Sequence, residues 1–195
     1  MPQDCAAIAV RGSVINEDIG ELTRESPIPN ATTFFPGPAV QQIGYATTDC
    51  AEAVRRYREH YGVREFLLLP NTESTISPGR TAVINVALAF VNGTMIELIE
   101  PVSGADAIYR DVLPQSGFAV RHHHLGYAMF SEAEWQAKQA EIERQKIPVV
   151  LSGEAPGVMR YQYIDLREDV GHYVEYLYYL GRGGQEMLSA IPHNH

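Results

Sequence analysis

Four polar residues stand at repeated positions of the chain, and their types suit a divalent metal ion. Gln42–Thr47 (QIGYAT) aligns with His124–Met129 (HLGYAM), and Met95–Ile99 (MIELI) aligns with Tyr173–Leu177 (YVEYL). The offsets are 124 − 42 = 82 and 175 − 97 = 78, which indicates a duplicated unit. The polar residues at the matched positions are Gln42, Glu97, His124 and Glu175. Two carboxylates, an imidazole and an amide oxygen make a mostly oxygen-donor set, suited to a six-coordinate divalent ion with open water positions.

Strand geometry predicts that these side chains point into a hollow. Alternate residues of a strand share a face, so each first strand has one face of small side chains after its polar residue. These faces are Gln42, Gly44 and Ala46 in one copy, and His124, Gly126 and Ala128 in the other. We expect the small residues to leave room for an ion and a small molecule. Glu97 and Glu175 each stand within an apolar strand, which is costly unless the carboxylate is paired or bound to a metal.

A run of three histidines, His122–His124, precedes the second Gly-Tyr pair. Alternation puts His122 and His124 on one face and His123 on the other. We take His124 as the ligand because it aligns with Gln42, and we expect His122 to support the site or contact the substrate. His123 is interpreted as structural or exposed, and a linear metal-binding histidine run is the remaining alternative.

The elements that must position these residues follow the same order in both copies. Each copy begins with a strand (42–47 or 124–129) and continues with a helix that has an N-cap pattern. The caps are Asp49 with Glu52, and Ser131 with Glu134. The first helix is expected to run to Tyr61 and end at Gly62, and the second to cover 135–146. Three strands follow in each copy, at 64–70, 81–91 and 94–100, and at 147–152, 159–166 and 172–180, with Asn92-Gly93 as a hairpin turn.

These elements predict one duplicated domain at 42–180, with module one at 42–101, a linker at 102–120 and module two at 121–180. Ala105–Leu113 of the linker is expected to form a short helix, closed by Pro114. Residues 1–41 are interpreted as an N-terminal arm and 181–195 as a tail, in which His193 and His195 have no role.

Composition narrows the classes of function. The chain has 195 residues, of which 45% are hydrophobic, enough for a buried core. A net charge of −9 argues against nucleic-acid or anionic-membrane partners, and no apolar run approaches the roughly 18 residues of a membrane span. Cys5–Val10, with Asp4 before it, is too short for a secretory signal, and Cys5 and Cys50 make no disulfide framework. We therefore expect a cytoplasmic protein.

Over residues 42–180 the chain resembles the vicinal oxygen chelate superfamily, which includes glyoxalase I, methylmalonyl-CoA epimerase, extradiol dioxygenases and fosfomycin- or bleomycin-resistance proteins. The resemblance is strongest at 42–47, 96–101 and 123–128, and Glu97–Pro101 followed by Tyr109–Asp111 and His123-His124 is similar to the epimerase-like branch. That branch usually has His where this chain has Gln42, and the Gln, Glu, His, Glu set resembles the zinc ligands of animal-type glyoxalase I. The resemblance implies an α+β fold with two tandem βαβββ modules, related by a pseudo-two-fold axis, in a curved eight-stranded mixed sheet with helices outside.

The resemblance also implies an enzyme of enolate chemistry that depends on one divalent metal ion: zinc, nickel, cobalt, manganese or magnesium. The reaction would be that of an epimerase, an isomerase or a glyoxalase-type lyase on a small carbonyl or thioester substrate. Glu175 would be the base, with Glu97 sharing the work, and the protein would be a homodimer. The alternatives are a small-molecule binding or resistance protein and an extradiol-type dioxygenase. The latter is disfavoured because non-haem iron oxygenases use two His and one carboxylate.

The sequence leaves the substrate open. Four tyrosines of module two either line an apolar pocket or pack under the helix: Tyr161, Tyr163, Tyr173 and Tyr179. Three arginines are candidates to meet a substrate carboxylate or a CoA phosphate: Arg80, Arg160 and Arg167.

Overall fold

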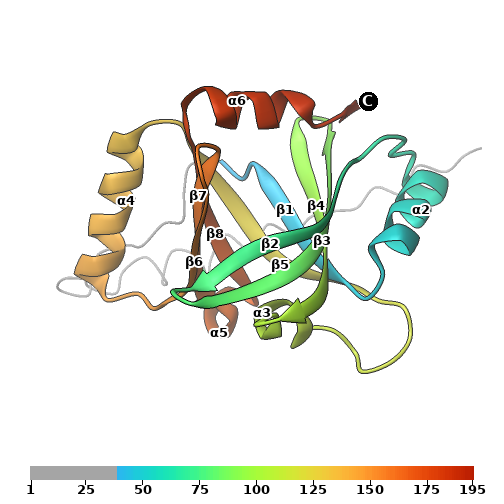
Figure 1. The fold of residues 1–195 in the computed structure, drawn as a ribbon, viewed down its shortest axis with the longest axis horizontal. Helices are drawn as coiled ribbons and strands as arrows, with labels where there is room; N and C mark the ends of the chain where they lie inside the picture. The colour runs from blue at the N-terminus through green and yellow to red at the C-terminus, as the bar shows by residue number, and fades with distance from the viewer. Residues whose placement is uncertain (1–38) are drawn as a thin grey trace, which may run out of the picture. The chain divides into compact units, whose positions relative to one another are not determined.

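Both sequence copies form the βαβββ unit that the repeat predicts (Figure 1). The computed structural model describes residues 39–195, so the predicted arm, 1–41, lies almost wholly outside the described residues. Module one comprises β1 (Gln42–Thr47), α2 (Cys50–Tyr61), β2 (Leu67–Ser77), β3 (Arg80–Val91) and β4 (Thr94–Gly104). Module two comprises β5 (Val120–Met129), α4 (Glu132–Gln145), β6 (Val149–Ala155), β7 (Met159–Leu166) and β8 (His172–Tyr179). The remaining elements are α3 (Ala107–Arg110), α5 (Arg167–Val170), α6 (Gly181–Ala190) and β9 (His193–Asn194).

The helix termini follow the capping signals in the sequence. The Asp49 side chain accepts a hydrogen bond from the Glu52 amide at 2.9 Å, and α2 ends at Gly62, whose φ is 70°. Ser131 and Glu134 form a reciprocal capping box, so α4 begins at Glu132, earlier than the sequence analysis placed it.

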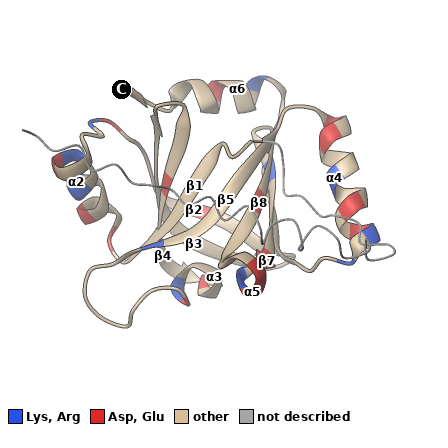
Figure 2. Cartoon of the chain, turned by 180° about the vertical axis from the view of Figure 1, so that it is seen from behind, with Lys and Arg blue, Asp and Glu red and all other residues tan. Residues whose placement is uncertain are grey.

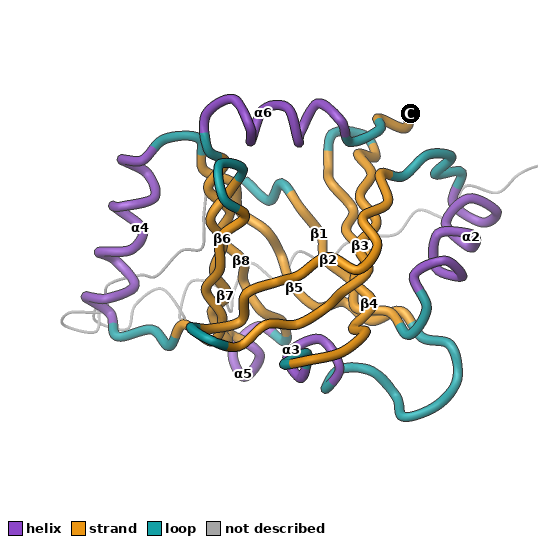
Figure 3. Tube along the Cα trace, in the orientation of Figure 1, coloured by secondary structure: helices purple, strands orange, loops and turns teal. Residues whose placement is uncertain are grey.

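The strands form a nearly closed mixed sheet in the order β2-β3-β4-β1-β5-β8-β7-β6, with β9 added beside β3 (Figure 3). Within each module the first and last strands pair in parallel, β1 with β4 and β5 with β8. The modules join through the antiparallel pair β1–β5, and β2 also contacts β6, which brings the sheet close to closure. In the β1–β5 register Gln42 pairs with Gly126 and Gly44 with His124. This reciprocal pairing relates the modules by the expected pseudo-two-fold axis.

The sheet separates an inner core from the surfaces under the flanking helices. Residues such as Leu88, Ile99 and Leu177 fill the inside of the curve, whereas Val54 of α2 packs with Leu98 outside it. Charged side chains lie mostly on the helices, and the strands carry few of them (Figure 2). A charged residue on the inner face is therefore exceptional and needs a specific partner.

Residues 181–195, expected to be a tail, instead form regular structure. The helix α6 lies across one end of the sheet and α3 and α5 lie at the other (Figure 1). The strand β9, which follows α6 in the chain, pairs with β3. The Asn194 side-chain oxygen accepts hydrogen bonds from the amides of Arg64 and Glu65. The glycines that suggested a tail allow close packing, since a Cβ on Gly183 would lie 2.2 Å from the Gly157 carbonyl oxygen.

The predicted linker, 102–120, is also shorter in the structure, because β4 extends to Gly104 and β5 begins at Val120. Its expected helix is reduced to α3. None of the helices among the described residues is long and apolar enough to cross a membrane.

Candidate metal centre

The four predicted ligand residues lie on the four central strands, β4, β1, β5 and β8. Glu97 and His124 both pair with Gly44, one from each side of β1. Gln42 and Glu175 both pair with Gly126, one from each side of β5. The duplication therefore brings residues up to 133 positions apart (175 − 42) into one small area of the sheet.

Three of the ligand candidates meet at the His124 imidazole. Its Nε2 atom lies 3.3 Å from Glu97 Oε2 and 3.1 Å from Glu175 Oε2. One ligand atom from each of the three residues can be chosen so that all lie within 4.8 Å of one another. Glu97 and Glu175 therefore lie on the same face of the sheet, as a shared metal site requires.

Each of the four predicted ligands has a buried polar atom that lacks a hydrogen bond among the described residues. Gln42 Oε1, Glu97 Oε2, His124 Nε2 and Glu175 Oε2 are all buried without a hydrogen bond, and the last three face one another only as close ion pairs. A buried polar atom without a partner is costly, and native proteins contain few of them. The donor atoms of Glu97, His124 and Glu175 are close enough together to fit one divalent cation.

The small residues of β1 and β5 have a different role from the one expected. A Cβ built on Gly44 would lie 1.8 Å from His124 Cε1, and one on Gly126 would lie 2.6 Å from Gln42 Oε1. The hollow beside each glycine is thus filled by the ligand candidate of the other module. The space beside each glycine therefore holds a protein side chain and has no room for a substrate.

A β-bulge changes the expected orientation of the histidine run. The β1–β5 register passes from Gly44 opposite His124 to Tyr45 opposite His122, which leaves His123 as an extra residue. His123 and His124 therefore both point inward and are 1% and 0% exposed. His122 instead lies on the outer side, where its ring contacts those of Tyr45 and His172. The structure thus gives His123 the position next to the ligand that alternation assigned to His122.

His123 connects the candidate ligand His124 to the backbone. Its Nε2 lies 2.9 Å from the Ile108 carbonyl oxygen, and its Nδ1 lies 3.0 Å from Nδ1 of His124. Because a carbonyl can only accept, His123 carries its proton on Nε2 and presents a lone pair at Nδ1. His124 must then donate from Nδ1, which leaves its Nε2 to face Glu97 and Glu175. The Ile108 carbonyl, through two rings, fixes the tautomer that metal binding requires.

Burial and charge shift the pKa values of these groups in opposite directions. Burial lowers the pKa of His124, but the negative charges of Glu175 and Glu97 outweigh it and raise that pKa to about 9. Burial, with the charge of His124, lowers the pKa of His123 to about 3, so His123 is neutral. Burial raises the pKa of Glu175. A metal ion at Nε2 of His124 would take the place of a proton.

A cavity of about 100 Å³ lies inside the curved sheet and includes Glu97 and Glu175 in its wall. Tyr161 and Tyr163 also line it, as one of the two sequence alternatives proposed, and the Tyr161 hydroxyl lies 3.2 Å from Ser74 Oγ. Tyr173 instead packs against the His123 ring. Met187 of α6 completes the wall, a residue that the sequence analysis did not select.

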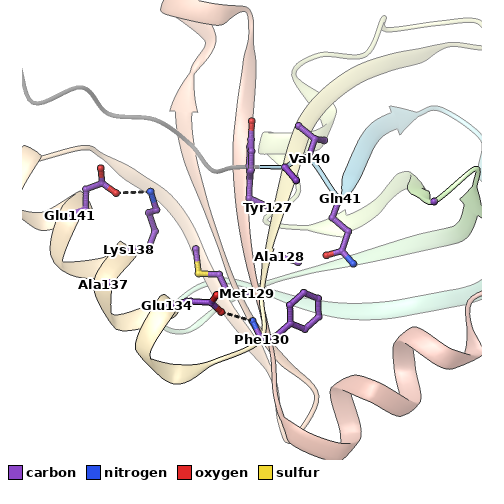
Figure 4. Close-up of a pocket in the computed structure, with 12 residues that line it drawn as sticks. Val40, Gln41, Tyr127, Ala128, Met129, Phe130, Glu134, Ala137, Lys138 and Glu141 are labelled. Atoms are coloured by element: carbon purple, nitrogen blue, oxygen red, sulfur yellow. Dashed lines mark hydrogen bonds and ion pairs between the residues drawn. The ribbon is translucent and has the colours of Figure 1, made fainter.

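A second, larger pocket of about 560 Å³ lies between α4 and β5 (Figure 4). Its polar interactions include a Lys138–Glu141 ion pair and a hydrogen bond from the Phe130 amide to Glu134. None of the four ligand candidates lines this pocket. The inner cavity is the better site for chemistry, despite its smaller volume, because its wall contains the unpartnered carboxylates.

Comparisons with known proteins agree with this fold. Residues 41–163 match the family model described as "Glyoxalase/Bleomycin resistance protein/Dioxygenase superfamily". A methylmalonyl-CoA epimerase from Mycobacterium tuberculosis has 15% identity and a TM-score of 0.50, over 77% of this chain and 91% of the epimerase. A hypothetical protein from Bacillus halodurans has 16% identity and a TM-score of 0.51, over 74% and 96%. A Streptomyces coelicolor methylmalonyl-CoA epimerase variant, in complex with 2-nitronate-propionyl-CoA, has 18% identity and a TM-score of 0.50, over 72% and 94%.

At these identities the solved structures support the fold alone. No curated protein sequence matches the chain. The expected α+β fold, with its curved mixed sheet and outer helices, is confirmed, and so is the resemblance on which that expectation rested.

Proposed function

The chain belongs to the glyoxalase/bleomycin resistance protein/dioxygenase superfamily, and on this premise we propose that it is a divalent-metal-dependent enzyme of enolate chemistry. The reaction class is that of an epimerase, an isomerase or a glyoxalase-type lyase acting on a small carbonyl or thioester substrate. The observation that carries the proposal is the cluster of Glu97, His124 and Glu175, whose ligand atoms lie within 4.8 Å of one another. The buried amide oxygen of Gln42, which has no hydrogen-bond partner among the described residues, supports it.

We assign Gln42, Glu97, His124 and Glu175 as the ligands of one ion, which would be zinc, nickel, cobalt, manganese or magnesium. A divalent ion bound there would polarise a substrate carbonyl and stabilise the negative charge that develops on its oxygen. The single His among the clustered residues favours this chemistry over an iron dioxygenase, which typically uses two His and one carboxylate.

Glu175 is proposed as the general base. Its carboxylate would take the proton from the carbon next to the substrate carbonyl, while the electron pair of that C–H bond moves toward the carbonyl oxygen. Glu97 and Glu175 approach His124 Nε2 at 3.3 and 3.1 Å from different strands. If solvent replaces the proton on Glu175 before that residue reprotonates the same carbon, the C–H hydrogen exchanges. If Glu97 instead delivers a proton that it already carries to the other face or to another position, the product is the epimer or isomer and Glu175 is left protonated. The side chains of Glu97 and Glu175 are 15% and 5% exposed, which limits their contact with bulk water.

Hydrogen exchange in deuterium oxide tests this assignment. Metal-loaded wild type should exchange the C–H hydrogen of a suitable hydroxycarbonyl, thioester or hemithioacetal. Glu175→Gln should keep some metal, because an amide oxygen can still coordinate, but should lose exchange by roughly 10²–10⁴-fold. Glu143→Gln, the same change on the exposed side of α4, is the matched control and should leave the rate unchanged.

An unchanged rate in metal-loaded Glu175→Gln would move the base to Glu97. Metal binding without exchange on any of the three substrate classes would instead support a binding or resistance protein of the same fold. Oxygen uptake with iron would support the dioxygenase alternative.

The homodimer and the cytoplasmic location also remain proposals that follow from the resemblance and the composition. Light scattering of the full chain gives the oligomeric state, and the mass of a single chain would contradict the dimer.

A further inference from the structure

The two carboxylates of the candidate metal centre have different neighbours across their strand pairs. Glu97 on β4 lies opposite Leu88 of β3, whereas Glu175 on β8 lies opposite Tyr163 of β7. The two places are equivalent, because each is in the antiparallel pair formed by the last two strands of its module. Residues directly opposite in such a pair have Cβ atoms about 4.5–5.5 Å apart, so their side chains contact each other. Glu97 therefore faces an aliphatic side chain, and Glu175 faces a phenol.

The Tyr163 hydroxyl and the Glu175 carboxylate interact in a buried environment. Both residues are almost fully buried, and both line the inner cavity. A hydrogen bond between the two side chains is one of the contacts that act on each group. Burial, followed by the charge of Glu175, raises the pKa of Tyr163 well above its usual value, so the phenol keeps its proton. The hydroxyl therefore donates and the carboxylate accepts.

The second carboxylate oxygen of Glu175 faces the candidate metal centre. This atom, Oε2, has no hydrogen bond and lies 3.1 Å from His124 Nε2. The hydrogen bond from Tyr163 must then go to Oε1. A carboxylate that is held at one oxygen loses the freedom to rotate about its terminal bond, so Oε2 keeps its direction.

The Tyr163 ring is itself enclosed by other rings. It lies edge-on to those of His123, His124, Tyr109 and Tyr173, with centroid distances from 5.1 to 6.5 Å. Edge-to-face packing is a favoured arrangement of aromatic pairs. A side chain enclosed in this way has little rotamer freedom, so its hydroxyl is in place before a substrate binds.

We infer that Tyr163 is the positioning residue of Glu175: its hydroxyl holds Oε1 and so keeps Oε2 directed at the candidate metal centre. The inference deepens the proposed function and rests on it for the role of Glu175 as the base. Leu88 cannot donate a hydrogen bond, so Glu97 lacks this support from its own strand pair. The difference between Tyr163 and Leu88 thus distinguishes two carboxylates that the duplication places equivalently.

Carbon NMR of the metal-free protein tests the contact without any reaction. Tyrosine labelled with ¹³C at Cζ reports the hydrogen bonding of its own hydroxyl, and the Tyr163 signal is identified by its loss in Tyr163→Phe. Glu175→Ala removes the acceptor and should shift that signal. Glu97→Ala removes the same charge from the same cavity and should shift it much less. No shift in Glu175→Ala, or an equal shift in Glu97→Ala, would overturn the inference.

Hydrogen exchange in deuterium oxide tests the consequence for catalysis. Tyr163→Phe removes one oxygen atom and keeps the ring. At saturating metal, kcat for exchange should fall by roughly 10–100-fold, the usual cost of losing a supporting partner, while KM stays close to that of the wild type. Tyr178→Phe is the matched control, because Tyr178 also lies on β8 but stacks on Trp135 of α4. It should leave both values unchanged.

An unchanged kcat in Tyr163→Phe would overturn the inference. A lower melting temperature with kcat and KM changing together would also overturn it, because that pattern indicates a structural role. If the metal-loaded wild type exchanges no substrate, the proposed catalysis fails, and the carbon signal still decides whether Tyr163 holds Glu175.

Discussion

The two modules have the same topology but contribute unequal halves of the candidate metal centre. Module one supplies Gln42 and Glu97. The amide oxygen of Gln42 has no hydrogen-bond partner in the described structure, and the Glu97 side chain is 15% exposed. Module two supplies His124, held through His123, and Glu175, whose side chain is 5% exposed. The duplication thus explains the equivalent positions of the four side chains. The pair from module two, His124 and Glu175, is the more buried, and His124 also contacts His123. We expect module two to dominate both affinity and catalysis.

The largest effects should come from the carboxylates. Glu97→Ala and Glu175→Ala each remove a charged ligand from a site with only two, so metal affinity should fall by more than about 100-fold, beyond the typical loss of a supporting partner. Metal analysis after dialysis and titration calorimetry measure the loss. Retention of tight binding by either variant would remove that residue from the ligand set.

Substitutions at Gly44 and Gly126 perturb His124 and Gln42, respectively, without removing either side chain. Gly44→Ala should displace the His124 ring, since its Cβ would lie 1.8 Å from Cε1, and should nearly abolish metal binding. Gly126→Ala meets Gln42 Oε1 at 2.6 Å and should cost less, because Gln42 is flexible and neutral. Metal titrations on folded variants, verified by thermal melts, decide. A larger effect at Gly126 would reverse the assigned dominance of module two.

The support of His124 should have an intermediate effect. His123→Phe keeps the ring but cannot accept the Nδ1 proton of His124, so metal affinity should fall by roughly 10–100-fold. His122→Phe is the matched control and should bind metal as wild type does, because His122 lies on the outer side of β5. The electronic spectrum of cobalt-loaded protein should change in the first variant only. A loss of metal affinity in His122→Phe but not in His123→Phe would instead support the orientation that strand alternation predicts, with His122 next to His124.

The smallest effect is expected at Gln42. Water can replace a neutral amide oxygen, so Gln42→Ala should weaken metal binding by about tenfold or less, and Gln42→His should strengthen it by making the two modules more alike. Competition with a chelator of known affinity measures both. A loss at Gln42→Ala as large as that at Glu97→Ala would contradict the unequal roles of the modules.

Several features of the fold could be predicted because their signals are local. The Asp49 and Ser131 caps, Gly62 and the Asn92-Gly93 turn each act within a few residues, and the structure has a helix terminus or hairpin at each. The repeat added a longer-range constraint, because two copies of one unit imply equivalent positions for Gln42 and His124. The convergence of the four polar residues on one face followed from strand alternation and that equivalence.

Other features depend on which segments become neighbours, and only the tertiary structure decided them. The bulge at His123 arises from the pairing of β5 with β1, so alternation within β5 could not reveal it. The glycines of α6 suggested an irregular tail, but in the structure Gly183 packs closely against the backbone of Gly157. The inner cavity is likewise assembled from strands of both modules and from α6. Local periodicity sets the direction of a side chain along its own strand, whereas its partners are set by register and packing between distant segments.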